Sequence, residues 1–288
     1  MRKLRIQEMK EDELAMVMSW AEDEGWNPGK YDYQSYYALD KRNLLLMFLN
    51  EEPIGSISIV KYSSQFAFIG LFIVKKKYRN QGYGTKLWEA AMELLEQYSS
   101  VALYAVPKQV RRYQKSGFSA QYFNSRWNLN ASKAEDVSTF ITNQQDPQVI
   151  YNKMLEYDCK LWGGQRSLFL DKVLTQEQSY AFVTFNQTTG KVNGYGVIRP
   201  CIKGYRIGPL YAHDLEDAKI LARVLMAQVP NESKVIFDIP EKNRFSHVFA
   251  EYFGLERAPG IDTFVMIKGE DYDRNEEICY GKASLEIG

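Results

Sequence analysis

The segment with the clearest chemical potential spans residues 74–85 and has the sequence VKKKYRNQGYGT. It follows an apolar run, Phe66–Val74, whose aromatic and β-branched residues predict a buried strand. It precedes residues 85–98, in which leucine and alanine recur at helical spacing. Glycines let backbone N–H groups approach a phosphate closely, and the positive end of the following helix faces the same point. With Arg79 as a bidentate donor, the segment predicts an anion-binding loop.

The charge distribution agrees with one local anion site. The 36 Lys and Arg balance the 36 Asp and Glu, so net neutrality argues against a nucleic-acid or acidic-membrane binder. Residues 1–130 nevertheless carry 18 basic against 14 acidic side chains, and residues 131–288 carry 18 against 22. Residues 53–88 contain six basic residues and no acidic one. Mixed charge is usual for a protein surface, so this acid-free stretch favours a bound anion at the glycine loop.

Other site classes are excluded by spacing. Position 87 is leucine rather than the third glycine of a dinucleotide loop, and no P-loop, His-Glu-x-x-His or Gly-x-Ser-x-Gly run occurs. The three cysteines lack metal-ligand spacing, so no metal site is expected and all three are predicted to be buried, reduced thiols. The longest apolar run, Leu44–Leu49, is too short to span a bilayer, and the charged N-terminus has no signal-peptide core. These features indicate a cytoplasmic protein that does not bind membranes.

The chain reads as two similar α/β halves. IGLFIV at residues 69–74 resembles IGPLYA at residues 207–212, and a helical segment follows each. VALYAV then matches VIFDIP, and YQKSGF matches AEYFGL, in the same order. Three echoes in one order predict a duplicated unit, and residues 131–148 have the polar composition of a linker.

In the glycine loop and the strand before it, the chain resembles the GNAT superfamily of acetyl-CoA-dependent N-acetyltransferases. That family follows a strand ending in valine with Arg/Gln-x-x-Gly-x-Gly/Ala, which wraps the pyrophosphate of coenzyme A. The resemblance implies that acetyl-CoA binds along the end of the strand and around the loop. The residues implied are Phe72, Ile73, Val74, Arg79, Asn80, Gln81, Gly82, Tyr83, Gly84 and Thr85. Asn80 stands where family loops often carry glycine, a change that asparagine's tolerance of unusual backbone angles permits.

The resemblance extends to a bacterial group of tandem GNAT proteins, through EGWNPG, FIGLFIV, IGPLYA and DIPEKN. It implies an α/β fold of two GNAT-like domains, each with a mixed, mostly antiparallel twisted sheet flanked by helices. We expect a catalytic domain over residues 1–130, a linker over 131–148 and a degenerate GNAT-like domain over 149–288. The second copy lacks the glycine loop and has Ala250 at the position of Tyr113.

The resemblance also assigns catalytic roles. The Tyr-x-x-x-Gly-Phe element places the acid that protonates the departing thiolate on Tyr113. Family enzymes often carry a glutamate base on the strand before the loop, but Phe66–Val74 has no carboxylate. Glu22 and Glu24, beside the EGWNPG loop, are the candidate bases, and water or attraction of a cationic amine remain alternatives. Three residues are candidates for acceptor binding, namely Trp26, Asn27 and Tyr104, which stands in place of an expected aspartate.

Three functions remain open. The first is direct acetyl transfer from acetyl-CoA to the primary amine of a small molecule, catalysed by a monomer or homodimer. The second is a non-catalytic acyl-CoA sensor or scaffold, favoured by the missing strand glutamate and by Tyr104. The third is a phosphate-binding module unrelated to acetyl transfer.

Overall fold

The computed structural model describes residues 3–131, 147–162, 166–272 and 274–288. The strands are β1 (Leu4–Glu8), β2 (Leu44–Leu49), β3 (Glu52–Lys61), β4 (Phe66–Val74), β5 (Ser100–Ala105), β6 (Ser119–Asn130), β7 (Tyr180–Phe185), β8 (Val192–Pro200), β9 (Tyr205–Ala212), β10 (Lys234–Pro240), β11 (Glu256–Arg257), β12 (Thr263–Gly269) and β13 (Cys279–Gly281). The α-helices are α1 (Glu11–Asp23), α2 (Asp32–Leu39), α3 (Tyr83–Leu95), α4 (Val110–Gln114), α5 (Pro147–Trp162), α6 (Ser167–Thr175), α7 (Leu215–Met226) and α8 (Ser246–Phe253).

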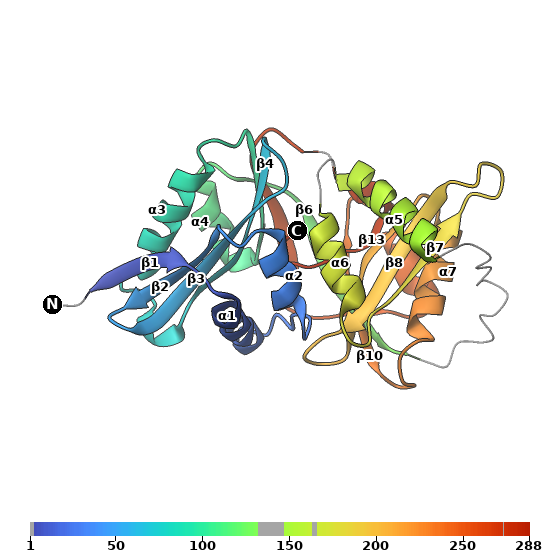
Figure 1. Ribbon diagram of the computed structural model, residues 1–288, viewed down its shortest axis with the longest axis horizontal. Helices are drawn as coiled ribbons and strands as arrows, with labels where there is room; N and C mark the ends of the chain where they lie inside the picture. Colours follow the sequence, from blue (N-terminus) through green and yellow to red (C-terminus); the bar gives the residue numbers. More distant parts are fainter. Residues whose placement is uncertain (1–2, 132–146, 163–165, 273) are drawn as a thin grey trace.

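One sheet runs through both halves of the molecule (Figure 1). Its order across the described residues is β1-β2-β3-β4-β5-β12-β6-β10-β9-β8-β7, and all pairs are antiparallel except β4 with β5 and β9 with β10. The halves exchange strands at the centre, because β12 pairs with β5 of the first half and β6 pairs with β10 of the second. Neither half therefore completes its sheet alone.

Helices cover both faces of this sheet. Alternate residues of β2 and β4 point to opposite sides, as the two-residue period of a strand requires. One face packs against α1, α2, α5 and α6 in a core that spans both halves, with Val17, Tyr36 and Phe169 fully buried. The other face packs against α3 in the first half and against α7 and α8 in the second. The α/β fold with a mixed, mostly antiparallel sheet is confirmed.

Each half contains one pair of parallel strands that diverge. In the first half the β4–β5 register runs from Phe66↔Ser100 only to Ile69↔Leu103. A bulge follows, with Leu71 at φ 45°, a conformation that a branched residue adopts only when its surroundings impose it. In the second half the β9–β10 register likewise ends at Ile207↔Phe237. Each half therefore has a gap in its sheet where the parallel strands separate, between β4 and β5 in the first half and between β9 and β10 in the second.

The gap in the second half is filled by the chain itself. β13 pairs with the end of β9, and the backbone N–H of Lys282 donates to Asp238 O of β10 at 2.8 Å. The segment then continues toward β4. A Cβ on Gly208 would lie 1.9 Å from Lys282 O, and one on Gly70 would lie 1.6 Å from Glu286 O. The glycine that IGLFIV and IGPLYA share is thus required at both sites because the same segment crosses it.

A buried ion pair joins the halves. Arg199 of β8 donates through Nε and Nη2 to the carboxylate of Asp32 at 2.8 and 3.0 Å, and both side chains are inaccessible to solvent. Asp32 also accepts from the backbone N–H of Gly29 and from the hydroxyl of Tyr36. Burial by itself would raise the pKa of Asp32, but the adjacent guanidinium lowers it below its ordinary value.

The predicted secondary structure is confirmed, whereas one of the three cysteine predictions is wrong. The strand expected at Phe66–Val74 is β4, and the helical segments expected after IGLFIV and IGPLYA are α3 and α7. Cys201 and Cys279 are buried free thiols, but the prediction for Cys159 is wrong, because it lies on the exposed side of α5. Most of the linker predicted over 131–148 lies outside the described residues. No helix in the described parts of the chain is long and apolar enough to cross a membrane.

Replacing Asp32 with asparagine should lower the free energy of unfolding by about 3–5 kcal/mol, because it leaves the Arg199 guanidinium buried without a counter-charge. Chemical denaturation measures the change. Glu51→Gln is the control, since Glu51 forms only an exposed 3.6 Å pair with Arg5 and should cost about 1 kcal/mol or less. Equal stability of the two variants would show that Arg199 does not need Asp32 as its counter-charge.

Candidate active site

A cavity of about 720 Å³ opens where β4 and β5 separate. Its walls come from the end of β4, the glycine loop, the segment after β5, α4 and the loop before α2. Second-half residues Gly260, Ile261, Thr263 and Leu285 complete it. The pairing of β4 with β5 ends at Ile69. Residues 72–74 of β4 therefore have no backbone partner among the described residues on the edge that faces β5. A ligand can therefore pair with this strand edge.

The glycine loop presents an uncapped helix end to the cavity. Gly82 is the N-cap of α3 in the left-handed conformation, with φ 83°, and no side chain caps the first turn. Asn80 also has a positive φ of 61°, as its residue type allows. First-turn amides without a side-chain cap suit an anion, and the dipole of α3 adds to that preference. Asn80, Gly82, Gly84 and Thr85 all line the cavity.

α7, the corresponding helix of the second half, begins differently. Asp214 caps it by accepting from the backbone N–H of Asp217 at 2.9 Å, and Glu216 and Asp217 add negative charge to the first turn. Carboxylates there satisfy the helix end and repel an anion. The N-terminus of α3 is therefore suited to a phosphate group, whereas the N-terminus of α7 is not.

Arg79 lies at the cavity wall but is already partnered. Its Nε donates to Val74 O at 2.7 Å, and its Nη2 donates to Glu24 Oε1 at 2.5 Å. The two side chains are 40% and 22% exposed, so the ion pair is accessible from the cavity mouth. The predicted phosphate ligand and the predicted base are thus in direct contact.

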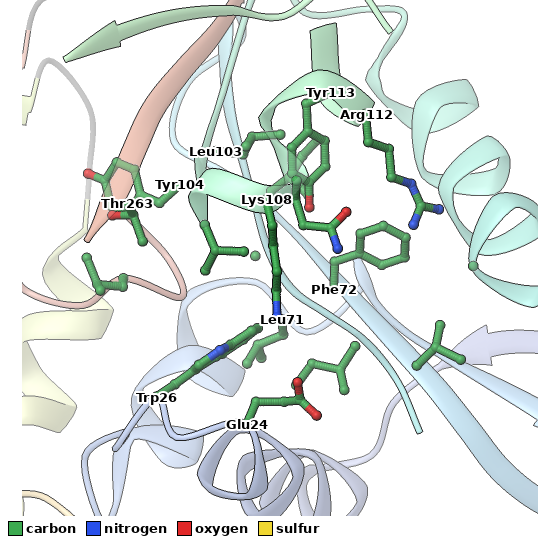
Figure 2. A pocket seen from close by; sticks show the side chains of 18 of the residues that line it. Glu24, Trp26, Leu71, Phe72, Leu103, Tyr104, Lys108, Arg112, Tyr113 and Thr263 are labelled. Atoms are coloured by element: carbon green, nitrogen blue, oxygen red, sulfur yellow. The ribbon is translucent and has the colours of Figure 1, made fainter. Parts of the chain in front are cut away.

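Two cations of the wall were not identified from the sequence. Arg112 lies over the ring of Phe72, 5.3 Å from its centroid, and its Nη2 would be 3.3 Å from a Cβ on Gly84. Lys108 extends into the cavity toward Leu71 and Trp26 (Figure 2). Neither side chain has an acidic partner within the described residues. The position of Arg112, next to Tyr113 on a short helix, was the one signal that could have indicated it.

Tyr113 projects from α4, and its hydroxyl points into the cavity (Figure 2). Its ring packs between Trp88 and Phe118, at centroid distances of 5.2 and 6.4 Å. Burial raises the pKa of Tyr113 to about 12, with Arg112 opposing part of that effect. The phenol therefore stays protonated at any physiological pH.

The acidic loop after α1 reaches the same cavity. Glu24 and Trp26 line it opposite Tyr113 (Figure 2). The loop is anchored to the rest of the protein by Arg126, whose Nη1 donates to Trp26 O at 2.7 Å. Arg126 is also paired through Nε and Nη2 with Asp238 at 2.7 and 2.9 Å, so the loop position depends on a buried ion pair.

Tyr104 contributes its ring to the cavity wall, close to Thr263 (Figure 2). The ring packs edge-on against Phe68 at 4.8 Å, and the buried ammonium of Lys282 lies 5.6 Å from its centroid. The hydroxyls of Tyr104 and Thr263 are buried without a hydrogen-bond partner in the described chain.

Four predicted residues lie outside this cavity's wall. Glu22 and Asn27 line a smaller cavity of about 160 Å³ next to it. Gln81 donates to Lys77 O at 2.9 Å, and Tyr83 packs its ring against Tyr78. Within the described residues, no group of His, Cys, Asp and Glu side chains is arranged to hold a metal ion.

Comparisons with known proteins identify both halves. Residues 9–118 match the model of the acetyltransferase (GNAT) family, and residues 154–281 match that of a second acetyltransferase (GNAT) domain. The chain is 28% identical over 277 residues to holothin acyltransferase of Pseudoalteromonas sp. strain SANK 73390, covering 96% of this chain and 92% of the relative. It is 22% identical over 184 residues to the uncharacterized N-acetyltransferase YitH of Bacillus subtilis, covering 62% of each chain.

Solved structures share the whole architecture. A putative acetyltransferase from Pyrococcus horikoshii superposes with a TM-score of 0.77 at 22% identity, covering 99% of this chain and 96% of that one. A tandem GNAT protein from the clavulanic acid biosynthesis pathway gives a TM-score of 0.62 at 13% identity, covering 92% and 98%. With a GNAT model matching each half and tandem GNAT neighbours along the whole chain, the protein belongs to the GNAT superfamily as a tandem GNAT acyltransferase.

Proposed function

We propose that the protein transfers an acetyl group directly from acetyl-CoA to the primary amine of a small molecule. The observation that carries the proposal is the shared cavity. The uncapped end of α3, the open edge of β4, the hydroxyl of Tyr113 and the carboxylate of Glu24 all face the same 720 Å³ space. In this arrangement the first half holds the donor, and the acceptor wall of the second half consists of Gly260, Ile261, Thr263 and Leu285.

The donor end fits coenzyme A. The amides after Gly82, together with Arg79 and Arg112, provide donors and charge for a pyrophosphate. The open edge of residues 72–74 can pair with the amide groups of the pantetheine arm. When bound, acetyl-CoA supplies the acetyl group as a thioester. The protein has to position this group, remove a proton from the acceptor's ammonium group and supply a proton to the departing thiolate.

Tyr113 is the proposed proton donor for the departing thiolate. Its hydroxyl faces the cavity, and no described group holds it in another hydrogen bond. With a pKa near 12, the phenol is protonated wherever an amine can be acetylated, so it is always able to donate.

Glu24 is the proposed base that accepts the proton from the acceptor's ammonium group. The Arg79–Glu24 pair makes this role depend on the donor, because a pyrophosphate and Glu24 would compete for one guanidinium. Binding of the donor then frees the carboxylate for the amine. Trp26 and Tyr104 are the proposed apolar walls around the acceptor. Since one relative is named for acylating holothin, holothin is one of the acceptors to assay.

The proposal is tested by calorimetry with acetyl-CoA, followed by thiol release across a panel of primary amines. Tyr113→Phe should lower kcat by about 100-fold and change the donor's Kd by less than about twofold, because it removes only the transferable proton. Tyr98→Phe, outside the cavity wall, is the control. Absence of acetyl-CoA binding, or a Tyr113→Phe enzyme with full kcat, contradicts the proposal.

The pH profile is an independent check on Tyr113. A general acid is active only below its pKa, so this group should cause no loss of kcat between pH 8 and about 10.5. A Tyr113-dependent decline with a midpoint near pH 9 would show that the phenol is not held in its protonated form.

Arg112→Met should weaken coenzyme A binding by about tenfold, since it removes a charged donor but retains an apolar stem over Phe72. Arg111→Met is the matched control on the same short helix, because Arg111 does not line the cavity. Equal effects of the two substitutions on Kd would remove Arg112 from the donor site.

Glu24→Gln should tighten coenzyme A binding by about two- to fivefold, because Arg79 no longer has a competing carboxylate. The same variant should lose kcat with amines at neutral pH. Asp23→Asn removes an equal charge one residue away that forms no described ion pair, and calorimetry should show a smaller change. If both variants bind coenzyme A equally, competition for Arg79 is disproved.

A further inference from the structure

The smaller cavity of about 160 Å³ lies at the junction of the two halves, next to the proposed acceptor wall. Gly25, Arg126 and Ile261 line both cavities, so the two cavities share part of their walls. The remaining walls of the smaller cavity are Glu22, Asn27, Asn128, Lys203, Lys234, Ile236 and Ala258. The two cavities are therefore neighbours at the junction of the halves.

The smaller cavity is rich in positive charge. Arg126, Lys203 and Lys234 line it, with Glu22 as the only carboxylate among the wall residues in the described chain. Neither lysine ammonium has an ion-pair partner among the described residues. Two ammonium groups without counter-charges favour an anion in the space beside them.

A cluster of buried charges lies behind this wall. Arg126 and Arg206 both pair with the single carboxylate of Asp238, and all three side chains are at least 97% buried. The Nε of Arg206 has no hydrogen-bond partner in the described structure. Arg206 also interacts with the buried carboxylates of Glu286 and Asp32, so the surplus positive charge at this cavity comes from the two wall lysines.

The position of Lys203 is fixed by the loop that carries Glu24 and Trp26. Asn27 accepts from the backbone N–H of Lys203 at 2.9 Å and donates to its carbonyl oxygen at 3.1 Å. Arg206 additionally donates to Asn27 O at 3.3 Å. Asn27, a predicted acceptor-binding residue, thus links the backbone beside the cationic cavity to the loop that carries the proposed base.

We propose that the acceptor carries an anionic group, a carboxylate or a phosphate, which binds between Lys203, Lys234 and Arg126 while its amine reaches Glu24. This inference rests on the proposed N-acetyltransferase function and specifies its substrate class. The opposite charges of the two subsites orient such a molecule, since reversing it would place each end against a like charge.

The experiment compares three series with the intact protein: ω-amino carboxylates of increasing chain length, the matched ω-amino amides, and ω-aminoalkyl phosphates. Thiol release from acetyl-CoA gives kcat/KM, and calorimetry gives the Kd of each compound for the protein saturated with coenzyme A. At least one anionic compound should exceed its matched neutral amide by about tenfold in both measurements. The optimal chain length reports the span between the subsites, and the two anionic arms distinguish carboxylate from phosphate.

Substitutions test the assignment. Lys203→Met and Lys234→Met should each lower kcat/KM for the preferred anionic acceptor by about three- to fivefold and leave the matched amide unchanged. The double variant should lose the preference, whereas Lys172→Met on α6 should not alter it. Two results would overturn the inference: neutral amides used or bound as well as anionic acceptors, or lysine variants whose main defect is weaker binding of coenzyme A. Absence of acetyl transfer to every amine would reject the proposed function, and the calorimetric preference would still decide the charge of the ligand.

Discussion

The separation of two parallel strands is the constraint on which the site depends. β4 and β5 are hydrogen bonded only as far as Ile69 and Leu103, and the bulge at Leu71 then turns the end of β4 away. Parallel strands that diverge leave a crevice at their carboxyl ends, where a following helix also directs its N-terminus. The cavity, the uncapped end of α3 and the open strand edge are consequences of this one departure from regular pairing.

The second half shows what happens when the same gap is not left open. β9 and β10 diverge in the same way, but residues 279–284 bridge them, and Asp214 caps the following helix. The second half instead provides part of the cavity wall, partners for buried ion pairs and the strand β12 to the first half. Asp32–Arg199 and the Asp238 cluster are buried ion pairs between or beside the halves, and their physical value lies in fixing the acidic loop over the cavity more than in net stability. The proposed active site is thus built from residues of both halves at their junction.

Local features were predictable from the sequence, and the relations between the halves were not. The apolar run of β4 and the periodicity of α3 are local signals, and both elements were placed to within three residues. The exchange of β6 and β12 depends on which distant strand offers the better register, and no local pattern encodes that choice. Arg112 and Lys108 were missed for a related reason: a cation on a short helix or turn has no distinctive spacing until its neighbours are known. The roles assigned to Tyr113 and Glu24 stay predictions, although the structure brings both to the same cavity.

The central claim is that donor and acceptor meet in the cavity between β4 and β5. A crystal structure of the protein with coenzyme A and an anionic amine acceptor tests it most directly. We expect the pyrophosphate on the amides after Gly82, the thiol within hydrogen-bond distance of Tyr113, and Glu24 released from Arg79 and facing the amine. A thiol bound away from Tyr113, or an acceptor located outside the walls shared by the two halves, would contradict it.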